Sequence, residues 1–346
     1  MEFTPRAKPI VTLPVPPNDF WSRKRNRQTH TVALEPLGMP TTISANDAAV
    51  LRAVELSAAR FSRAVAPTPT RAARIRIVVR SEQNTEPVPS DLPARLVYSG
   101  VDEWITVTAG AWGHGFANLD TREAVVVLSG SLAVEPVFVS RYFIDHYLTN
   151  FLFDDWGMLH ASGVLTADGA RLLLLIAPHN TGKSTTALRL VRAGWRFLTD
   201  SMVLFQQSRG RRTFGGYPVN EVKLRDDVLA LFPEYGGARV SVREHEKTLV
   251  NLRAAHAGSV IDEVFAPERT TLCFVAHGDD AGSRVESLPA QEVLPLLAEN
   301  TAYWDEPERF ALHAARLEQL AQSVPACCLI MGHDPEALMR TLETLA

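Results

Sequence analysis

Alternating apolar and polar positions mark the first part of the chain. In a strand with one buried face every second side chain is apolar, because successive side chains point to opposite faces. This pattern predicts three strands, at residues 74–79, 104–108 and 124–128. An N-cap signal at residues 44–47 predicts a helix that runs to about residue 65. These elements indicate an α+β region that follows an irregular, proline-rich segment over residues 1–40.

A continuous apolar run marks the second part. Leu172-Leu-Leu-Leu-Ile176 predicts a strand that is buried on both faces. An amphipathic helix is predicted upstream, at residues 139–152, and apolar positions on one face predict another helix downstream, over residues 187–191. The remaining pattern completes an α/β protein. It predicts strands at 202–205, 270–275 and 326–331, and helices at 226–232, 289–300, 311–323 and from Pro335.

The pattern Ala177-x-x-x-x-Gly182-Lys183-Ser184 lies between the buried strand and its helix. It fits the phosphate-binding loop, in which backbone N–H groups and the helix N-terminus face phosphate oxygens. Lys183 can then reach the β- and γ-phosphates, and the Ser184 hydroxyl can ligate Mg²⁺. Asn180 stands where glycine is common, and asparagine tolerates positive φ. The alternative is a chance match in a polar turn. The candidate nucleotide-binding residues are Ala177, Pro178, His179, Asn180, Thr181, Gly182, Lys183, Ser184 and Thr185.

An aspartate follows the loop at a short distance. Gly194 is predicted to end the helix, Phe197 begins the next strand, and Asp200 lies at the end of that strand, 17 positions after Lys183. A carboxylate there can ligate Mg²⁺ or accept a proton from an attacking hydroxyl. The alternative for Asp200 is a turn or N-cap role.

A histidine precedes the loop. His160 lies in an apolar strand, and a turn at residues 167–169 separates that strand from the loop strand. A β-hairpin would bring His160 near the phosphates. Taken alone, a histidine in such a strand is more often a core residue.

Three segments together carry a family resemblance: His160-Ala-Ser-Gly-Val, Gly182-Lys-Ser-Thr-Thr-Ala-Leu and Gly194-Trp-Arg-Phe-Leu-Thr-Asp200. They resemble the catalytic domain of HPr kinase/phosphorylase, and most closely the divergent branch found beside peptide natural-product genes. Some members of that branch phosphorylate a serine of a lasso-peptide precursor. The resemblance is strong over residues 159–204 and weaker, through residues 217–224 and 247–253, to about residue 300.

The resemblance implies a phosphate-loop kinase core with a mixed sheet over residues 139–346, and an N-terminal α/β region, residues 1–138, available for substrate recognition. It implies that His160 lies beside the γ-phosphate and that Asp200 is the first of two paired aspartates. Ser201 replaces the second. Arg253 would be the arginine that assists transfer, although the glycine-rich signature that follows it in true HPr kinases is absent.

The resulting hypothesis is a kinase that uses ATP and Mg²⁺ to phosphorylate a hydroxyl, most simply a serine of a peptide or protein. The catalytic residues would be His160, Lys183, Asp200 and Arg253, with Ser184 and Asp200 as metal ligands. Two alternatives remain open at this stage. One is a kinase for the hydroxyl of a sugar or amino acid. The other is a nucleotide-binding partner protein with little catalysis, which Ser201 favours.

Charge and cysteine content limit the kinds of binding partner and the cellular compartment that we expect. The net charge is −4, which gives no electrostatic basis for binding bulk nucleic acid. The basic run of residues 23–27 is either a solvated arm or a contact for a peptide or phosphate. Three cysteines without disulfide or zinc spacing fit a reducing cytosol. We expect no signal peptide and no membrane span, and the sequence leaves oligomerisation open.

Several charged residues stay ambiguous. Lys223 and Arg225, two apart on a predicted strand, either line a substrate cleft or are solvated. His245 and Lys247 are predicted in a charged, mobile loop. The acidic pairs at 226–227 and 279–280 are expected in turns or caps rather than at metals.

Overall fold

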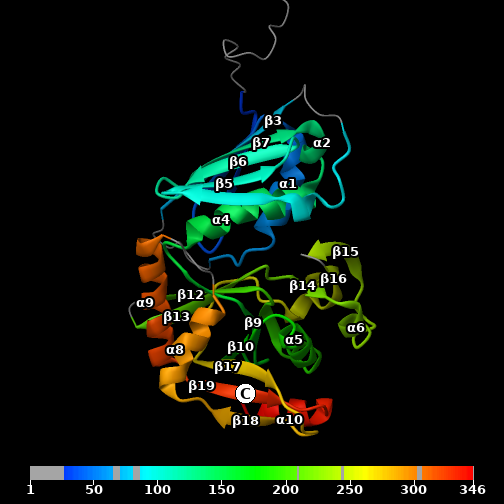
Figure 1. The fold of residues 1–346 in the computed structure, drawn as a ribbon, viewed down its shortest axis with the longest axis vertical. Coiled ribbons are helices and arrows are strands. Elements are labelled where there is room, and N and C mark those ends of the chain that lie inside the picture. Colours follow the sequence, from blue (N-terminus) through cyan, green and yellow to red (C-terminus); the bar gives the residue numbers. More distant parts are fainter. Residues whose placement is uncertain are drawn as a thin grey trace, which may run out of the picture.

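A computed structural model describes residues 27–64, 71–80, 86–208, 210–242, 245–301 and 306–345. Helices and strands are mixed along the chain, which confirms the α/β class predicted from the sequence. One large sheet and its helices form the upper part of the molecule, and the other sheets form the lower part (Figure 1). Most of residues 1–40 lie outside the described residues, but β1 already begins at His30.

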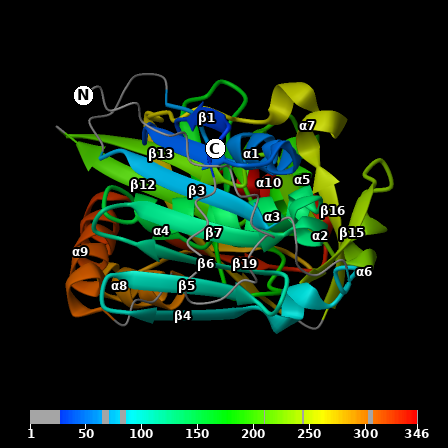
Figure 2. The same cartoon turned by 90° about the horizontal axis from the view of Figure 1, so that it is seen from above.

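The upper sheet has seven strands in the order β1-β2-β3-β7-β6-β5-β4. Its β2–β3 and β3–β7 pairs are parallel and the others antiparallel. The three strands predicted here are confirmed as β3, β5 and β7. The strands are β1 His30–Leu34, β2 Thr41–Ala45, β3 Ala73–Arg80, β4 Val97–Val101, β5 Trp104–Ala109, β6 Gly113–Asn118 and β7 Glu123–Ser129. Figure 2 looks down on this sheet and shows its strands side by side.

Helices cover the lower face of this sheet (Figure 1). The helix predicted from residue 44 is shorter than expected, with a 3-10 turn Ala48–Val50 before α1, Leu51–Ala58. The helix predicted at residues 139–152 starts earlier, as α3 Pro136–Val139, continues through a π-helical turn Ser140–Ile144 and ends as α4 Asp145–Leu152. Its apolar side chains, including Phe143 and Tyr147, pack in the same core as the sheet. A short α2, Gly130–Ala133, and a 3-10 turn, Leu92–Arg95, complete this part.

A six-stranded sheet in the order β11-β9-β10-β17-β19-β18 forms the lower core. It is mixed, because β10 pairs antiparallel with β9 and parallel with β17. The strands are β9 Ala161–Leu165, β10 Arg171–Ile176, β11 Arg196–Thr199, β17 Arg269–His277, β18 Arg284–Ser287 and β19 Ala326–Met331. The helices are α5 Lys183–Arg192, α8 Ala290–Glu299, α9 Pro307–Ser323 and α10 Pro335–Glu343.

The apolar run of β10 explains how this sheet is buried. Leu173 and Leu175 point into the core shared with α5 and α10, whereas Leu172 and Leu174 point into the core shared with α8 and α9. Helices therefore cover both faces of the sheet (Figure 1), and the continuous apolar run is what such a strand requires. Cys273 and Cys327 lie side by side on the neighbouring strands β17 and β19, and both are buried free thiols.

Two small sheets complete the lower part, in the orders β13-β12-β8 and β14-β16-β15. The strands of these two sheets are β8 Gly157–Leu159, β12 Met202–Ser208, β13 Arg211–Tyr217, β14 Glu221–Leu224, β15 Gly237–Val242 and β16 His245–Asn251. The prediction that His245 and Lys247 lie in a loop is wrong, since both residues belong to strand β16. Short helices α6, Asp226–Leu229, and α7, Leu252–Ala255, and a 3-10 turn, Ala257–Ser259, flank these sheets. No helix in the described ranges is long and apolar enough to cross a membrane.

A buried ion-pair network joins the helices of the upper part to strand β14. Arg60, which is 2% exposed, donates to Asp145 at 2.8 Å and to Glu221 at 3.1 Å. Arg141 donates to the other oxygen of Glu221 at 2.5 Å. Burial lowers the pKa of Arg60, but the carboxylates of Asp145 and Glu221 outweigh it and raise the pKa above its usual range. The boundary predicted at residue 138 stays a prediction, because α4 packs with the upper sheet and also joins this network.

We expect Arg60→Met to lower the free energy of unfolding by about 3–5 kcal/mol, because it leaves two buried carboxylates without their shared cation. The matched control is Arg63→Met, whose side chain is 66% exposed in its pair with Asp262, and which should cost less than about 1 kcal/mol. Urea unfolding of both variants measures the difference. Equal effects would contradict the role assigned to the buried network.

Candidate functional site

The turn between β10 and α5 has the backbone shape that the phosphate-loop pattern predicts. Asn180 adopts a φ of 65° and Gly182 a φ of 92°, both left-handed, and α5 begins immediately afterwards at Lys183. The expectation that Asn180 tolerates positive φ is confirmed. Gly182 has a second constraint, because a Cβ atom there would lie 3.0 Å from the Met331 methyl group. The turn therefore directs the N-terminus of α5 toward the space above the loop.

Lys183 folds back over the loop. Its Nζ donates to the carbonyl oxygen of Ala177 at 2.5 Å and to that of Pro178 at 2.8 Å, and the residue is 7% exposed. At the start of a helix a lysine would be expected to face solvent, and Lys183 is instead buried. Burial lowers the pKa of Lys183, and the nearby carboxylate of Asp200 opposes this shift.

Asp200 lies at the end of β11, beside the start of α5. One carboxylate oxygen accepts a hydrogen bond from the Ser184 hydroxyl at 2.6 Å, and the other accepts one from the Ser162 hydroxyl. Burial raises the pKa of Asp200, while the two hydroxyl donors and Lys183 act in the opposite direction. Ser162 was not identified from the sequence. The signal was present, because Ser162 lies two residues after His160 on the strand predicted to pair with the loop strand.

The predicted hairpin is confirmed and places His160 at the loop. Strand β9 runs antiparallel to β10, and His160 lies directly before β9. The His160 ring centroid is 4.8 Å from that of His179, within the loop, and Nδ1 of His160 is 2.9 Å from the carbonyl oxygen of Ser201. His160 and Asp200 therefore approach the loop from neighbouring strands.

These residues surround one cavity of about 780 Å³. Residues 179–185 line it together with His160, Asp200 and Ser201. Ala177 and Pro178 contribute through their carbonyl oxygens, which hold Lys183. The lining also includes Glu221, Lys223, Arg225 and Lys247, so the substrate-cleft interpretation of Lys223 and Arg225 agrees with their position.

The cavity does not contain a complete metal site made of protein side chains. Within the described part of the chain, no group of three or more His, Cys, Asp or Glu residues is placed to hold an ion. Ser184 and Asp200 supply two adjacent oxygen ligands of the kind that Mg²⁺ prefers. Mg²⁺ usually keeps several waters and takes further ligands from phosphates, so this partial set fits a nucleotide-bound ion.

Arg253 lies elsewhere. Its side chain is 40% exposed on α7 and forms an ion pair with Asp262 at 3.1 Å, and it is not among the residues that line the cavity. The acidic pair at 226–227 is exposed and paired with Arg239 and Arg225. Of the basic run at residues 23–27, only Arg27 is among the described residues.

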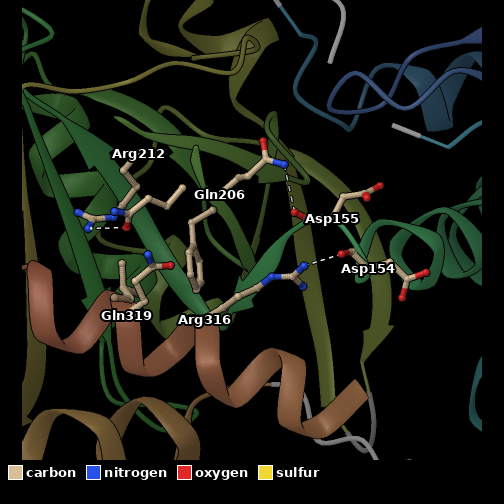
Figure 3. A pocket seen from close by; sticks show the side chains of 9 residues that line it. Asp154, Asp155, Gln206, Arg212, Arg316 and Gln319 are labelled. Carbon is tan, nitrogen blue, oxygen red and sulfur yellow. Dashed lines mark hydrogen bonds between the residues drawn. The ribbon is translucent and has the colours of Figure 1, made fainter. Parts of the chain in front are cut away.

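A second hollow, of about 310 Å³, lies beside α9 (Figure 3). Arg316 points from α9 toward the end of α4 and donates to the carbonyl oxygens of Phe153, Asp154 and Trp156. Gln206 donates to the carbonyl oxygen of Asp155. These bonds satisfy carbonyl groups of the segment between α4 and β8, and the residues predicted for the site do not line this hollow.

Ser162→Ala tests the environment assigned to Asp200. Loss of the Ser162 hydroxyl removes a donor to the charged carboxylate, so we expect the pKa of Asp200 to rise. Carbon-13 NMR of the labelled aspartate carboxyl groups, followed through an acid titration, measures this shift. Ser99→Ala, on the exposed edge strand β4 of the upper sheet, is the control and should leave the titration unchanged. A fall in the pKa in Ser162→Ala would contradict the assignment.

Comparison with known proteins gives little beyond the outline of the fold. No protein-family model and no curated protein sequence matches the chain. The solved structure of the Hpr(Ser) kinase/phosphatase from Coxiella burnetii is similar to part of it, over 54% of this chain and 93% of that chain, with 9% sequence identity and a TM-score of 0.27. A likeness of this extent supports no functional conclusion, which has to come from the cavity itself.

Proposed function

We propose that this protein is an ATP-dependent phosphotransferase that moves the γ-phosphoryl group to a hydroxyl. One observation carries the proposal: a left-handed turn at the start of α5, a buried lysine and a serine–aspartate pair face the same cavity. Each of these features serves a phosphate group, and their combination is what phosphoryl transfer requires.

The loop would bind the nucleotide phosphates through backbone N–H groups at the start of α5, where the helix dipole favours negative charge. Lys183 is held at the base of the same loop by two carbonyl oxygens. A phosphate oxygen would offer its ammonium group a full negative charge in place of neutral carbonyls. Because burial disfavours the charged lysine, this new partner stabilises it.

Ser184 and Asp200 would hold Mg²⁺ between the protein and the phosphates. The ion, when bound, would neutralise charge on the nucleotide phosphates. A buried carboxylate whose only protein donors at hydrogen-bonding distance, among the described residues, are two hydroxyls fits a nearby cation.

Asp200 would also accept the proton of the incoming hydroxyl. Its raised pKa makes the carboxylate a stronger base than an exposed aspartate. The acceptor oxygen would bond to the γ-phosphorus as the bond to the β-phosphate oxygen breaks. The products would be a phosphate monoester and ADP, with the proton on Asp200. His160 would assist from beside the loop, whereas the exposed position of Arg253 offers no support for its proposed role.

The acceptor is, in this proposal, a serine of a peptide or protein, which rests on the resemblance of residues 159–204 to HPr-kinase-like proteins. The N-terminal region, residues 1–138, would select it. A sugar or amino-acid hydroxyl is the alternative. Ser201 lines the cavity where the related kinases have a second aspartate, so we infer transfer in the forward direction without useful phosphorolysis. The same serine is the feature that favours a nucleotide-binding protein with little catalysis.

Lys183→Met tests nucleotide binding. The variant loses a charged donor to the phosphates, worth about 1.5–3 kcal/mol, so we expect affinity for Mg·ATP to fall about 10- to 100-fold in calorimetric titration. The midpoint of thermal unfolding should change little, because the gain from removing a buried charge is offset by the loss of two hydrogen bonds. Arg192→Met, on the exposed side of α5 in a pair with Glu234, is the matched control. Unchanged affinity in Lys183→Met would refute the phosphate-loop assignment.

Asp200→Asn tests the base. We expect the rate of phosphoryl transfer to fall by about 10²-fold or more, the usual scale for a lost general base, with the fold retained. The assay follows label from γ-labelled ATP to a panel of serine peptides and small hydroxy compounds. Asp91→Asn, in an exposed pair with Arg95, serves as the control. A transfer rate equal to that of the unmodified protein would place the base elsewhere. ATP binding without transfer to any acceptor would instead favour the nucleotide-binding alternative.

A further inference from the structure

Two lysines line the same cavity as the phosphate loop. Strand β14 pairs with β16 so that Lys223 lies across from Leu249. Lys247 is two residues from Leu249, and residues two apart on a strand share a face. Lys223 and Lys247 therefore project from the same face of this sheet, and both line the cavity.

Neither ammonium group has a carboxylate at ion-pair distance among the described residues. Within the described ranges of the chain, Lys223 and Lys247 donate no side-chain hydrogen bond and form no ion pair, and each is only partly exposed. Glu221 is the carboxylate on the same strand. It still favours the charged form of Lys223, but Arg60 and Arg141 already bind both of its oxygens.

The surroundings disfavour positive charge at Lys223. Burial lowers the pKa of Lys223 to about 8. The positive charges of Arg141, Lys247 and Arg60 act in the same direction, and the carboxylate of Glu221 opposes them. A methionine of similar length would avoid this cost. A charged group that lies in a cavity and lowers the stability of the folded protein is a candidate for binding a ligand of opposite charge.

Both lysines share the cavity with Asp200, the proposed point of transfer. Lys247 is near enough to Lys183, Asp200 and Lys223 for its charge to act on the pKa of all three. A molecule whose hydroxyl reached Asp200 would place its neighbouring groups along this pair, whereas the nucleotide phosphates already have the loop and Lys183.

We propose that Lys223 and Lys247 bind a negatively charged group, a carboxylate or a phosphate, on the acceptor that carries the hydroxyl. This inference rests on the proposed phosphoryl transfer and narrows its acceptor to an anionic hydroxy compound. A serine flanked by acidic residues and a small hydroxy compound with its own phosphate share this chemistry.

The test measures the preference for negative charge with the nucleotide in place. Four probes are titrated by calorimetry against protein saturated with Mg²⁺ and a non-hydrolysable ATP analogue. The carboxylate arm compares the capped peptides Glu-Ser-Glu and Gln-Ser-Gln, and the phosphate arm compares glycerol 3-phosphate with glycerol. We expect the charged member of at least one arm to bind about 10- to 100-fold more tightly than its neutral partner, and the tighter arm identifies the source of the charge.

The double variant Lys223→Met/Lys247→Met should lose this preference while its affinity for the ATP analogue stays within about threefold. Arg239→Met is the matched control: it removes a positive charge from the same sheet, but Arg239 pairs with Asp226 and lies outside the cavity lining, so the preference should persist. Lys223→Met alone should raise the midpoint of thermal unfolding by about 2–5 °C, because it removes a destabilising buried charge. That rise would also show that Lys223→Met folds.

Three results would overturn the inference. The unmodified protein would bind charged and neutral probes equally, or the preference would survive in the double variant, or the double variant would lose the ATP analogue instead. The last result would assign both lysines to the nucleotide phosphates. Failure of the ATP analogue to bind the unmodified protein would be a separate outcome, since it removes the proposed kinase function before the acceptor probes are considered.

Discussion

The turn at residues 177–183 sets the geometry of the whole site. Two left-handed residues, Asn180 and Gly182, reverse the chain within a few residues of a strand buried on both faces. Lys183 then returns to the carbonyl oxygens of Ala177 and Pro178 and closes the loop on itself. Because β10 is held between two cores, the turn has a rigid base, and the start of α5 is directed into the cavity. His160 and Asp200 are placed by strands in the same sheet.

The part of the cavity lining that strand β14 supplies depends on the ion pairs of Glu221. Glu221 begins β14 and is bound by Arg60 and Arg141, which come from the helices under the upper sheet. The upper part of the molecule therefore positions the strand that carries Lys223. Burying an ion pair costs free energy, and leaving one of its charges buried without the partner costs more. This contact therefore fixes one arrangement of the two parts. Glu221 thus connects the lining of the cavity to the upper part of the molecule.

The elements predicted correctly are those whose pattern is local and strong. The apolar run of β10, the loop glycine and the cap at Gly194 each have one structural explanation, and the hairpin follows from the turn between two strands. Strand β6 was missed because it carries two glycines and no clear alternation; a Cβ atom at Gly115 would lie 2.5 Å from the Tyr147 hydroxyl, a long-range constraint. Lys247 was assigned to a loop because its strand is charged. The burial of Lys183 depends on tertiary packing, which spacing along the chain does not reveal, whereas the spacing of Ser162 from His160 was a usable signal that was missed.

The central claim is that the loop before α5 binds the phosphates of a nucleotide, and a crystal structure grown with Mg²⁺ and a non-hydrolysable ATP analogue tests it most directly. The account predicts phosphate oxygens against the backbone N–H groups of residues 180–185. It predicts that Lys183 Nζ moves from the carbonyl oxygens of Ala177 and Pro178 to the phosphates, and that a magnesium ion lies beside Ser184 and Asp200. A nucleotide bound in the hollow beside α9, or a loop that stays closed on Lys183 at saturating analogue, would contradict the account.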